Sequence, residues 1–552
     1  MKRTTYFLAG ISLLVLGGLV GQWMHRPSPT PSQSKALATL ESAYEVIRTS
    51  YVERVPPDSL AASAVTGMTE ALDPFSVYLS SQRMKQVRET FRGSFEGIGV
   101  SYELISGPGG QDTIGVVSVV PQGPSAEAGL RPGDRIVQVA GTSAVGWSHQ
   151  KIQKRLKGPR GSTVPVTLRR PAAADRIQAT ITRDTVPLET VQAAYMMEGG
   201  TGYIRLGRFA ETTHEEVSSS LKSLKEKGME RLIFDLRGNG GGLMSMAEKV
   251  ADEFLVDGQT IVTAQSRHAE YGGARAATDE GLFEDKPVVV LVDEHSASAS
   301  EIVAGALQDH DRALIVGRHT FGKGLVQRQF SLGDGSVLRL TVARFYTPSG
   351  RLLQRTGERG RDSVVTDRST PRRDSSNVPD SLIYRTDAGR TVIGGGGIHP
   401  DRTVPTPTYT SFRDTAETRG LLRSFARSWI DARDDSLRTQ WSGRPDAFAN
   451  MFSLPRSVYP AFVNYAEANG VGRRGVVNDT STVAVTPAEI QRARADIESV
   501  IAAYVGQRLF GPSMRLRLLN QADPILDTVR ASWPAAERRA QRYPVQDTGV
   551  QP

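Results

Sequence analysis

Three serines at alternating positions, Ser296, Ser298 and Ser300, stand where a strand is expected to pass into a helix. Residues 286–292 before them form a short apolar run rich in β-branched side chains, which is typical of a buried strand in a parallel or mixed sheet. Apolar residues then recur at helical spacing over 302–307. The first N–H groups of a helix have no intrahelical acceptor and can stabilise a developing negative charge. A serine at this junction is therefore well placed to act as a nucleophile if a base lies nearby.

Lys323 is the candidate for that base. It lies among glycines between two expected strands, at 313–317 and 325–332. If residues 323–327 are extended, Lys323 and Gln327 share one face, because the strand period is two, and Gln327 can hold the lysine amine by a hydrogen bond. Burial in an apolar pocket disfavours the charged form of a lysine, so its pKa falls and it becomes a usable general base near neutral pH.

This stretch resembles the carboxyl-terminal processing peptidases, also called tail-specific proteases. The resemblance is carried by Ser-Ala-Ser-Ala-Ser-Glu-Ile (296–302), Ala-Gly-Ala-Leu-Gln-Asp (304–309) and Thr-Phe-Gly-Lys-Gly-Leu-Val-Gln (320–327). It implies a Ser-Lys dyad with a supporting glutamine, formed here by Ser298, Lys323 and Gln327.

A second motif of the same family matches Asp-Leu-Arg-Gly-Asn-Gly-Gly-Gly at 235–242. On its residues alone it is a tight glycine-rich turn from a strand into a helix that begins at Met244. The resemblance implies that a glycine N–H of this motif helps to form the oxyanion hole. We assign this role to Gly242, paired with the N–H of Ala299, with the neighbouring glycines as alternatives, because acyl transfer needs donors aimed at the tetrahedral oxygen.

Residues 92–182 resemble a PDZ domain, in which backbone N–H groups of a glycine turn capture a terminal carboxylate and the peptide adds as a strand to a sheet edge. The expected carboxylate-binding loop consists of Gly97, Ile98, Gly99 and Val100. Residues 129–139 match the characteristic turn and strand of these domains. Arg131 is either a residue that relays peptide binding to the active site or a surface arginine before a Pro-Gly turn.

The N-terminus begins with Lys2 and Arg3, and an apolar run follows over residues 6–24. This run can just span a bilayer, and we favour an uncleaved membrane anchor over a cleaved signal peptide. The two basic residues should stay in the cytoplasm, so the bulk of the chain is expected on the periplasmic side. Helical spacing over 37–51 and 60–72 predicts two amphipathic helices, which serve either core packing or dimerisation.

The predicted fold is α/β multidomain, with a helical N-terminal segment, a PDZ domain, a mixed α/β (crotonase-like) protease core and a helical C-terminal extension. The expected parts are an anchor or signal peptide (1–25), a proline-rich linker (26–34), a helical region (35–91), the PDZ domain (92–182), the protease core (183–405) with an insertion poor in apolar periodicity (351–390), and the extension (406–552). The extension could cap the protease, contact a membrane or adaptor, or assemble subunits.

Composition narrows the classes of function. The 552 residues are too many for one core, and 39% hydrophobic with 23% charged residues is ordinary for globular proteins. The chain has no cysteine, which excludes a thiol nucleophile, disulfides and thiolate metal sites. A net charge of +8 comes without an aromatic-plus-basic motif, so a nucleic-acid partner is not expected.

Three other catalytic classes fit less well. Residues 317–324 nearly spell a phosphate-binding loop, but Gly324 replaces the Ser or Thr that binds magnesium. His295 is close to Ser298 in sequence but is poorly placed for a Ser-His-Asp triad. No His-Glu-x-x-His motif occurs, and no metal or other cofactor is expected. The sequence therefore predicts a serine endopeptidase acting on the tails of protein substrates, and the alternative is a catalytically inactive PDZ scaffold or adaptor in the cell envelope.

Overall fold

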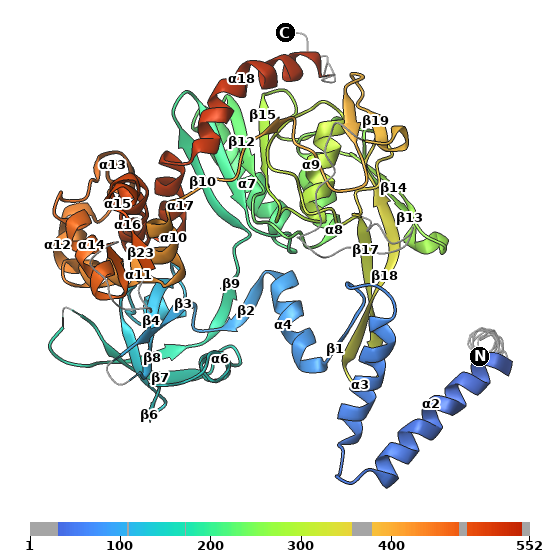
Figure 1. The fold of residues 1–552 in the computed structure, drawn as a ribbon, viewed down its shortest axis with the longest axis horizontal. Helices are drawn as coiled ribbons and strands as arrows, with labels where there is room; N and C mark the ends of the chain where they lie inside the picture. The colour runs from blue at the N-terminus through green and yellow to red at the C-terminus, as the bar shows by residue number, and fades with distance from the viewer. Residues whose placement is uncertain (1–30, 108–109, 172, 356–377, 474–482, 544–552) are drawn as a thin grey trace, which may run out of the picture.

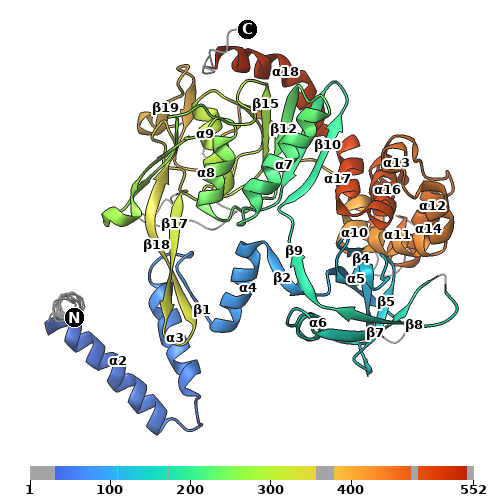
Figure 2. The ribbon, with the colours of Figure 1, turned by 180° about the vertical axis from the view of Figure 1, so that it is seen from behind.

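The computed structural model of the chain describes residues 31–107, 110–171, 173–355, 378–473 and 483–543. A helical N-terminal region is followed by a small β-rich unit, a mixed α/β core and a group of C-terminal helices (Figure 1; seen from behind in Figure 2). This is the α/β multidomain fold expected from the sequence. None of the described helices is both long and apolar enough to cross a bilayer, and the anchor predicted at residues 6–24 lies outside the described residues.

The α/β core is built on a six-stranded sheet. Its strands, in spatial order, are β10 (Val191–Met197), β11 (Thr201–Leu206), β12 (Arg231–Asp235), β15 (Val288–Val292), β16 (Leu314–Gly317) and β21 (Arg402–Thr403). β10 is antiparallel to β11, and the other neighbouring strands are parallel. One face packs against α7 (Thr213–Glu226), α8 (Met244–Asp252) and α9 (Ala299–Asp309), and the other packs against α18 (Pro524–Arg542).

The covering of both faces explains the apolar run before the serines. All five residues of β15 are buried. Val288, Val290 and Val292 join the core formed with α7, α8 and α9, whereas Val289 and Leu291 join the core formed with α18. Successive side chains point to opposite faces, so both sets must be apolar. The strands predicted at this run and at 313–317 are confirmed.

A second, antiparallel sheet lies beside the α/β core. It contains β1 (Val77–Leu79), β13 (Thr260–Gln265), β14 (Gly273–Ala276), β17 (Leu325–Leu332) and β18 (Ser336–Tyr346). β17 and β18 form a long hairpin that reaches toward the N-terminal helices, where β1 pairs with β18 (Figure 1). The predicted strand at 325–332 is confirmed, and it carries the segment that contains Lys323 into this sheet.

The small β-rich unit forms its own sheet and core. Its strands lie in the order β3 (Val100–Ser106), β4 (Asp112–Val119), β5 (Arg135–Val139), β7 (Thr163–Arg169) and β8 (Ile177–Thr182), with β6 (Thr142–Ser143) beside β5, and its helices are α5 (Pro124–Glu127) and α6 (His149–Leu156). The ribbon of β2 (Ser94–Gly97) and β9 (Asp184–Pro187) joins it to the rest of the chain. β3 is an edge strand of this sheet: it pairs with β4 on one side, and no described strand pairs with its other side.

The N-terminal region consists of α2 (Pro31–Ser50), α3 (Pro57–Glu70) and α4 (Ser81–Arg92). The two predicted amphipathic helices are confirmed, but the linker predicted at 26–34 is wrong in its second half. α2 already begins at Pro31, because proline lacks only an N–H that the first turn leaves unbonded and its fixed φ suits a helix start. Residues 26–30 lie outside the described residues.

The C-terminal extension is helical, as predicted, apart from a short pair of strands, β22 (Val471–Arg473) and β23 (Val483–Val485). Its helices before α18 are α10 (Ser411–Thr418), α11 (Leu421–Asp431), α12 (Asp434–Trp441), α13 (Pro445–Met451), α14 (Val458–Ala468), α15 (Pro487–Arg492), α16 (Arg494–Phe510) and α17 (Pro512–Gln521). These helices enclose a core of their own and lie against the small β-rich unit (Figure 1). The extension therefore contacts that unit through α11 and α16 and the six-stranded sheet through α17 and α18.

The insertion predicted at 351–390 does not extend over all of that range. Arg351 is fully buried and forms an ion pair with the buried Asp309. Strands β19 (Ile383–Arg385) and β20 (Thr391–Ile393) form a hairpin. The sequence did not reveal these packed ends because their burial rests on charged partners rather than on apolar periodicity, and residues 356–377 lie outside the described residues.

Candidate active site

Ser298 directly precedes α9, and its backbone lies at φ 56° and ψ −111°. A non-glycine residue with positive φ is strained and persists only where its surroundings hold it. Ser296 and Ser300 are buried, and their hydroxyls donate to the carbonyls of Leu236 (2.8 Å) and Asn239 (2.9 Å). Ser298 is the partly exposed member of the three, so its hydroxyl is the one that a substrate can reach.

Glu301 forms hydrogen bonds both to the turn that contains Ser298 and to the segment that contains Lys323. Its carboxylate is fully buried; Oε2 accepts from the N–H groups of Ser298 (2.8 Å) and Lys323 (2.9 Å), and Oε1 accepts from the N–H of Gly322 (2.7 Å) and the hydroxyl of Thr320 (2.6 Å). Burial raises the pKa of the Glu301 carboxyl, and these four donors oppose the rise. All four groups donate, so the geometry is that of an ionised carboxylate.

No role for Glu301 was predicted from the sequence. Its position three residues after Ser298, the residue that directly precedes the helix, is the spacing of a capping box and could have identified it. Its contacts with Thr320 and Gly322 were not predictable from that spacing.

Lys323 Nζ donates to Gln327 Oε1 at 3.0 Å, which is the predicted hydrogen bond. The two residues meet although β17 begins only at Leu325 and a bulge lies between Val326 and Gln327. Within the described residues no hydrogen bond joins the Lys323 amine to the Ser298 hydroxyl. Their backbones are nevertheless linked, because both donate to the same oxygen of Glu301.

The surroundings of Lys323 favour the neutral amine. Burial, together with the positive charge of Arg339, lowers the pKa of Lys323 from 10.5 to about 8, while the charges of Glu301 and Asp73 act in the opposite direction. Lys323 Nζ lies 4.7 Å from the centre of the Phe75 ring. Phe75 lies in the N-terminal region and Arg339 in β18, and neither was predicted from the sequence to be part of the site.

The glycine-rich turn after β12 packs against the serine turn. A Cβ on Gly241 would lie 2.9 Å from Ser298 Cβ and 3.0 Å from Ala299 N. The Gly241 N–H donates to Asn239 Oδ1 at 2.9 Å, so it is already occupied. Gly242 follows with an exposed backbone at φ 151°, and Ala299 provides the first N–H of α9. The structure thus places the glycine turn that includes Gly241 and Gly242 against Ala299. The roles of Gly242 and Ala299 in an oxyanion hole stay a prediction.

The residues that suggested a Ser-His-Asp triad, a phosphate-binding loop or a metal site do not have the arrangement that those sites need. His295 is exposed, and its backbone N–H donates to Asp293 Oδ1 at 3.0 Å. Strand β17, and not a helix, follows Gly324, so the residues that nearly spell a phosphate-binding loop lack the helix start that such a loop needs. Across the described ranges, no group of three or more His, Asp or Glu side chains is arranged to hold a metal ion.

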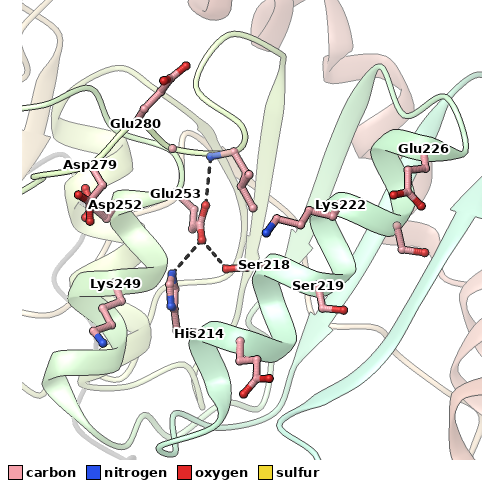
Figure 3. Close-up of a pocket in the computed structure, with 14 residues that line it drawn as sticks. His214, Ser218, Ser219, Lys222, Glu226, Lys249, Asp252, Glu253, Asp279 and Glu280 are labelled. Carbon is pink, nitrogen blue, oxygen red and sulfur yellow. Dashed lines mark hydrogen bonds and ion pairs between the residues drawn. The ribbon is translucent and has the colours of Figure 1, made fainter.

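A pocket of about 730 Å³ lies between α7 and α8, and none of the dyad residues lines it (Figure 3). At its centre Glu253 accepts hydrogen bonds from the Ser218 hydroxyl and, at 3.1 Å, from the Leu282 N–H, and it lies 2.8 Å from His214 Nε2. Ser218 donates to Glu253 and not to His214, so these three groups do not have the serine-to-histidine contact of a Ser-His-acid triad.

The predicted carboxylate-binding loop connects β2 to β3. Gly99 has φ 74°, which favours glycine. The carbonyl of Ile98 accepts from the Ser125 N–H at 3.0 Å, and that of Gly99 accepts from the Val120 N–H at 3.0 Å. The loop is thereby fixed beside the free edge of β3. Arg131 is exposed and its N–H donates to Asp134 at 2.8 Å, so its relay role stays a prediction.

Comparison with known proteins gives three matches to family models. They are Peptidase family S41 over residues 200–360, a PDZ domain over 115–170, and the N-terminal domain of the activating protease CtpB over 22–83. The first range includes all three residues of the predicted dyad and its glutamine, and the second begins after the loop at 97–100. These matched ranges end before the C-terminal extension.

Relatives span a larger part of the chain. The carboxy-terminal-processing protease of Bartonella bacilliformis is 33% identical over 365 residues, which cover 65% of this chain and 81% of that protein. The carboxy-terminal processing proteases CtpB and CtpA of Bacillus subtilis are each 36% identical, over 59% and 58% of this chain and 67% and 66% of their own lengths.

Proposed function

The chain belongs to the carboxyl-terminal processing serine peptidases, and on this basis we propose that Ser298 is its nucleophile, Lys323 its general base and Gln327 the residue that positions the lysine. The observation that supports this proposal most directly is the buried carboxylate of Glu301, which joins the backbones of Ser298 and Lys323. The strained backbone of Ser298 and the lowered pKa of Lys323 are both features of an activated nucleophile.

The reaction proceeds by acyl transfer. Neutral Lys323 takes the proton of the Ser298 hydroxyl while Oγ attacks the scissile carbonyl carbon, and the N–H groups of Gly242 and Ala299 stabilise the oxyanion. The protonated lysine returns the proton to the leaving amine as the C–N bond breaks. Water, deprotonated by Lys323, then attacks the ester on Ser298; the new carboxyl end is released as the C–Oγ bond breaks, and the protonated lysine returns the proton to Ser298 Oγ. For the first step the Lys323 amine must approach the Ser298 hydroxyl to about 3 Å, a contact that often tightens only in the substrate complex.

The substrate is the accessible C-terminal tail of a protein. The loop of Gly97, Ile98, Gly99 and Val100 holds the terminal carboxylate, and the tail adds as a strand to the free edge of β3. The tail upstream of the bound end then reaches Ser298. The relatives are named as proteases, which does not support the alternative of an inactive scaffold.

The N-terminal region determines where the enzyme works. Residues 6–24 anchor it in the inner membrane with the described domains on the periplasmic side. α2 and α3 carry exposed apolar side chains, including Leu37 at 61% and Met68 at 50% of full exposure, and these pair with a second copy. Membrane fractionation of the full chain, and the mass in solution of a Leu37→Glu variant, test these two assignments.

The test of the activity is digestion of a protein with an unstructured tail by the purified chain. Ser298→Ala and Lys323→Ala should each abolish cleavage, and removal of the substrate's last residues should weaken cleavage by the unaltered enzyme. Cleavage that survives in Ser298→Ala would mean that the nucleophile is misassigned. Cleavage by the unaltered enzyme that is indifferent to the substrate's C-terminus would contradict delivery by the PDZ domain.

A further inference from the structure

A basic pocket of about 320 Å³ lies between the PDZ domain and the C-terminal extension. On the PDZ side it is lined by residues of β3, β4 and β5, and on the other side by residues of α11, α16 and α17. Its lining includes five arginines: Arg135, Arg423, Arg427, Arg508 and Arg515. Four of the five belong to the extension, which lies outside the family ranges matched above.

One part of the pocket is organised by Asp431 at the end of α11. Its two carboxylate oxygens each lie 2.5 Å from an arginine, Arg135 of the PDZ domain and Arg508 of α16. Asp434 lies 3.6 Å from Arg508 but is held more closely by Arg438, at 2.7 Å, so that pair adds no net charge. A single carboxylate is thus shared by two arginines.

The other part is organised by Glu103 on β3. Arg427 lies 2.9 Å from this carboxylate and Arg423 3.9 Å from it. Arg515 forms no ion pair among the described residues; its guanidinium lies 5.0 Å from the centre of the Tyr504 ring, and its Nε is buried without a partner. Four of the five arginines therefore share two carboxylates, Arg515 pairs with neither, and the pocket has an excess of positive charge.

The arginines also act on each other. The pKa of Arg135 is lowered, first by burial and then by the charges of Arg508 and Arg427, although Asp431 opposes the shift. An anion placed in the pocket would relieve this repulsion, because an opposite charge within a few ångströms favours the charged form.

The pocket opens beside the strand that would receive a substrate tail. Along β3, Tyr102 and Leu104 pack toward the PDZ core, whereas Glu103 points to the outer face, where it meets α11. Side chains of a strand added to β3 would alternate in the same way. Every second side chain of a bound tail would therefore lie on the outer face, next to Glu103 and Arg423.

We propose that this pocket binds an aspartate or glutamate side chain of a tail held along β3, so that the C-terminal extension selects acidic tails. This inference rests on the proposed delivery of the tail by the PDZ domain. Arg423 suits the task because its side chain is 58% exposed and its contact with Glu103 is long. A guanidinium has five N–H donors, so those that are not hydrogen-bonded to the Tyr504 side chain can bind an incoming carboxylate.

Binding of short synthetic peptides to the full chain carrying Ser298→Ala tests the inference without cleavage. The peptides have a free carboxyl end and differ by one Glu→Gln exchange, which is moved along the tail position by position. We expect the Glu peptide to bind about threefold to tenfold more tightly, at alternate positions only, and the difference to shrink at high salt.

Two further exchanges sharpen the test. Arg423→Gln should remove the preference for Glu, whereas Arg530→Gln should keep it, because Arg530 is 59% exposed on α18 and does not line the pocket. Glu103→Gln should strengthen binding of the Glu peptide, since it frees Arg427 and Arg423 from their internal carboxylate.

The outcomes separate this inference from the proposed function. Equal binding of Glu and Gln peptides at every position, while amidation of the carboxyl end still weakens binding, would overturn the inference and leave tail delivery intact. A peptide that binds equally well with a free and an amidated end would overturn tail delivery and this inference with it.

Discussion

Replacement of Glu301 by glutamine is expected to destabilise the protein and to change the ionisation of Lys323, the proposed general base. The carboxylate accepts four hydrogen bonds in a fully buried place, two at each oxygen. A glutamine turns one oxygen into an NH₂ group, which then faces at least one backbone N–H that has no other acceptor. An unsatisfied buried N–H costs about 1–3 kcal/mol, and exchange of a charged for a neutral acceptor weakens each remaining bond by about 0.5–1 kcal/mol. The free energy of unfolding should therefore fall by about 3–5 kcal/mol.

The same exchange has an electrostatic consequence at Lys323. The negative charge of Glu301 raises the pKa of Lys323, so its removal should move the midpoint of the rise in kcat/KM with pH to below about 8. Urea unfolding and the pH dependence of kcat/KM, measured under conditions where the variant is folded, give the two quantities separately.

Glu253→Gln is the matched control, because Glu253 is also a buried glutamate that accepts several hydrogen bonds but lies in the pocket between α7 and α8. It should lower stability and leave the pH midpoint where it is in the unaltered enzyme. A Glu301→Gln variant with stability within about 1 kcal/mol of the parent and an unshifted midpoint would refute the role given to this carboxylate.

Three other outcomes are expected. In the unaltered enzyme kcat/KM should rise with pH and level off above about 8. Burial lowers the pKa of Lys323 from 10.5 to about 8, and the neutral amine that acts as the proposed base is present above that pKa. A flat profile from pH 6 to 10 would contradict this. Ser298→Gly and Ser298→Ala should both be inactive, but the glycine variant should be about 1 kcal/mol more stable in urea unfolding, since the φ of 56° strains alanine and not glycine; equal stabilities would argue against strain at this turn. In Gly133→Ala, the new Cβ would lie 1.7 Å from Arg508 Nη1 at a backbone φ of 103°, so the contact between the PDZ domain and the extension should loosen. Limited proteolysis should therefore become faster. An unchanged rate would show that Arg508 can move aside at little cost.

The strands and helices around the dyad could be predicted because each is defined by a local pattern. The run at 286–292 is uniformly apolar, since α9 covers one face of β15 and α18 the other. The Lys323–Gln327 hydrogen bond was predicted from an extended 323–327 segment, and the structure contains the bond at 3.0 Å, although β17 begins only at Leu325 and a bulge precedes Gln327.

The environment that tunes Lys323 could not be predicted in the same way. Phe75 and Arg339 approach it only because β1 pairs with β18 and β18 with β17, and no local pattern specifies those pairings. The packed ends of the predicted insertion were missed for a related reason: Arg351 looks like a solvent-exposed arginine in the sequence, and its burial is made tolerable by Asp309 and Gln308, which are distant in sequence.

The C-terminal extension lies outside the matched family ranges, yet its contacts make it part of the catalytic unit. Its Asp523 lies 2.6 Å from Arg237, which also pairs with Asp235 at 2.7 Å, so the motif that carries Gly242 is held from one side by the extension. α18 covers the face of the six-stranded sheet that includes Val289 and Leu291, and without α18 that apolar face would meet water. The helices that reach the PDZ domain and the helix that completes the protease core are thus one continuous segment. Under the inference drawn above, a substrate tail at the basic pocket would be bound by the same segment that supports the glycine turn beside Ser298.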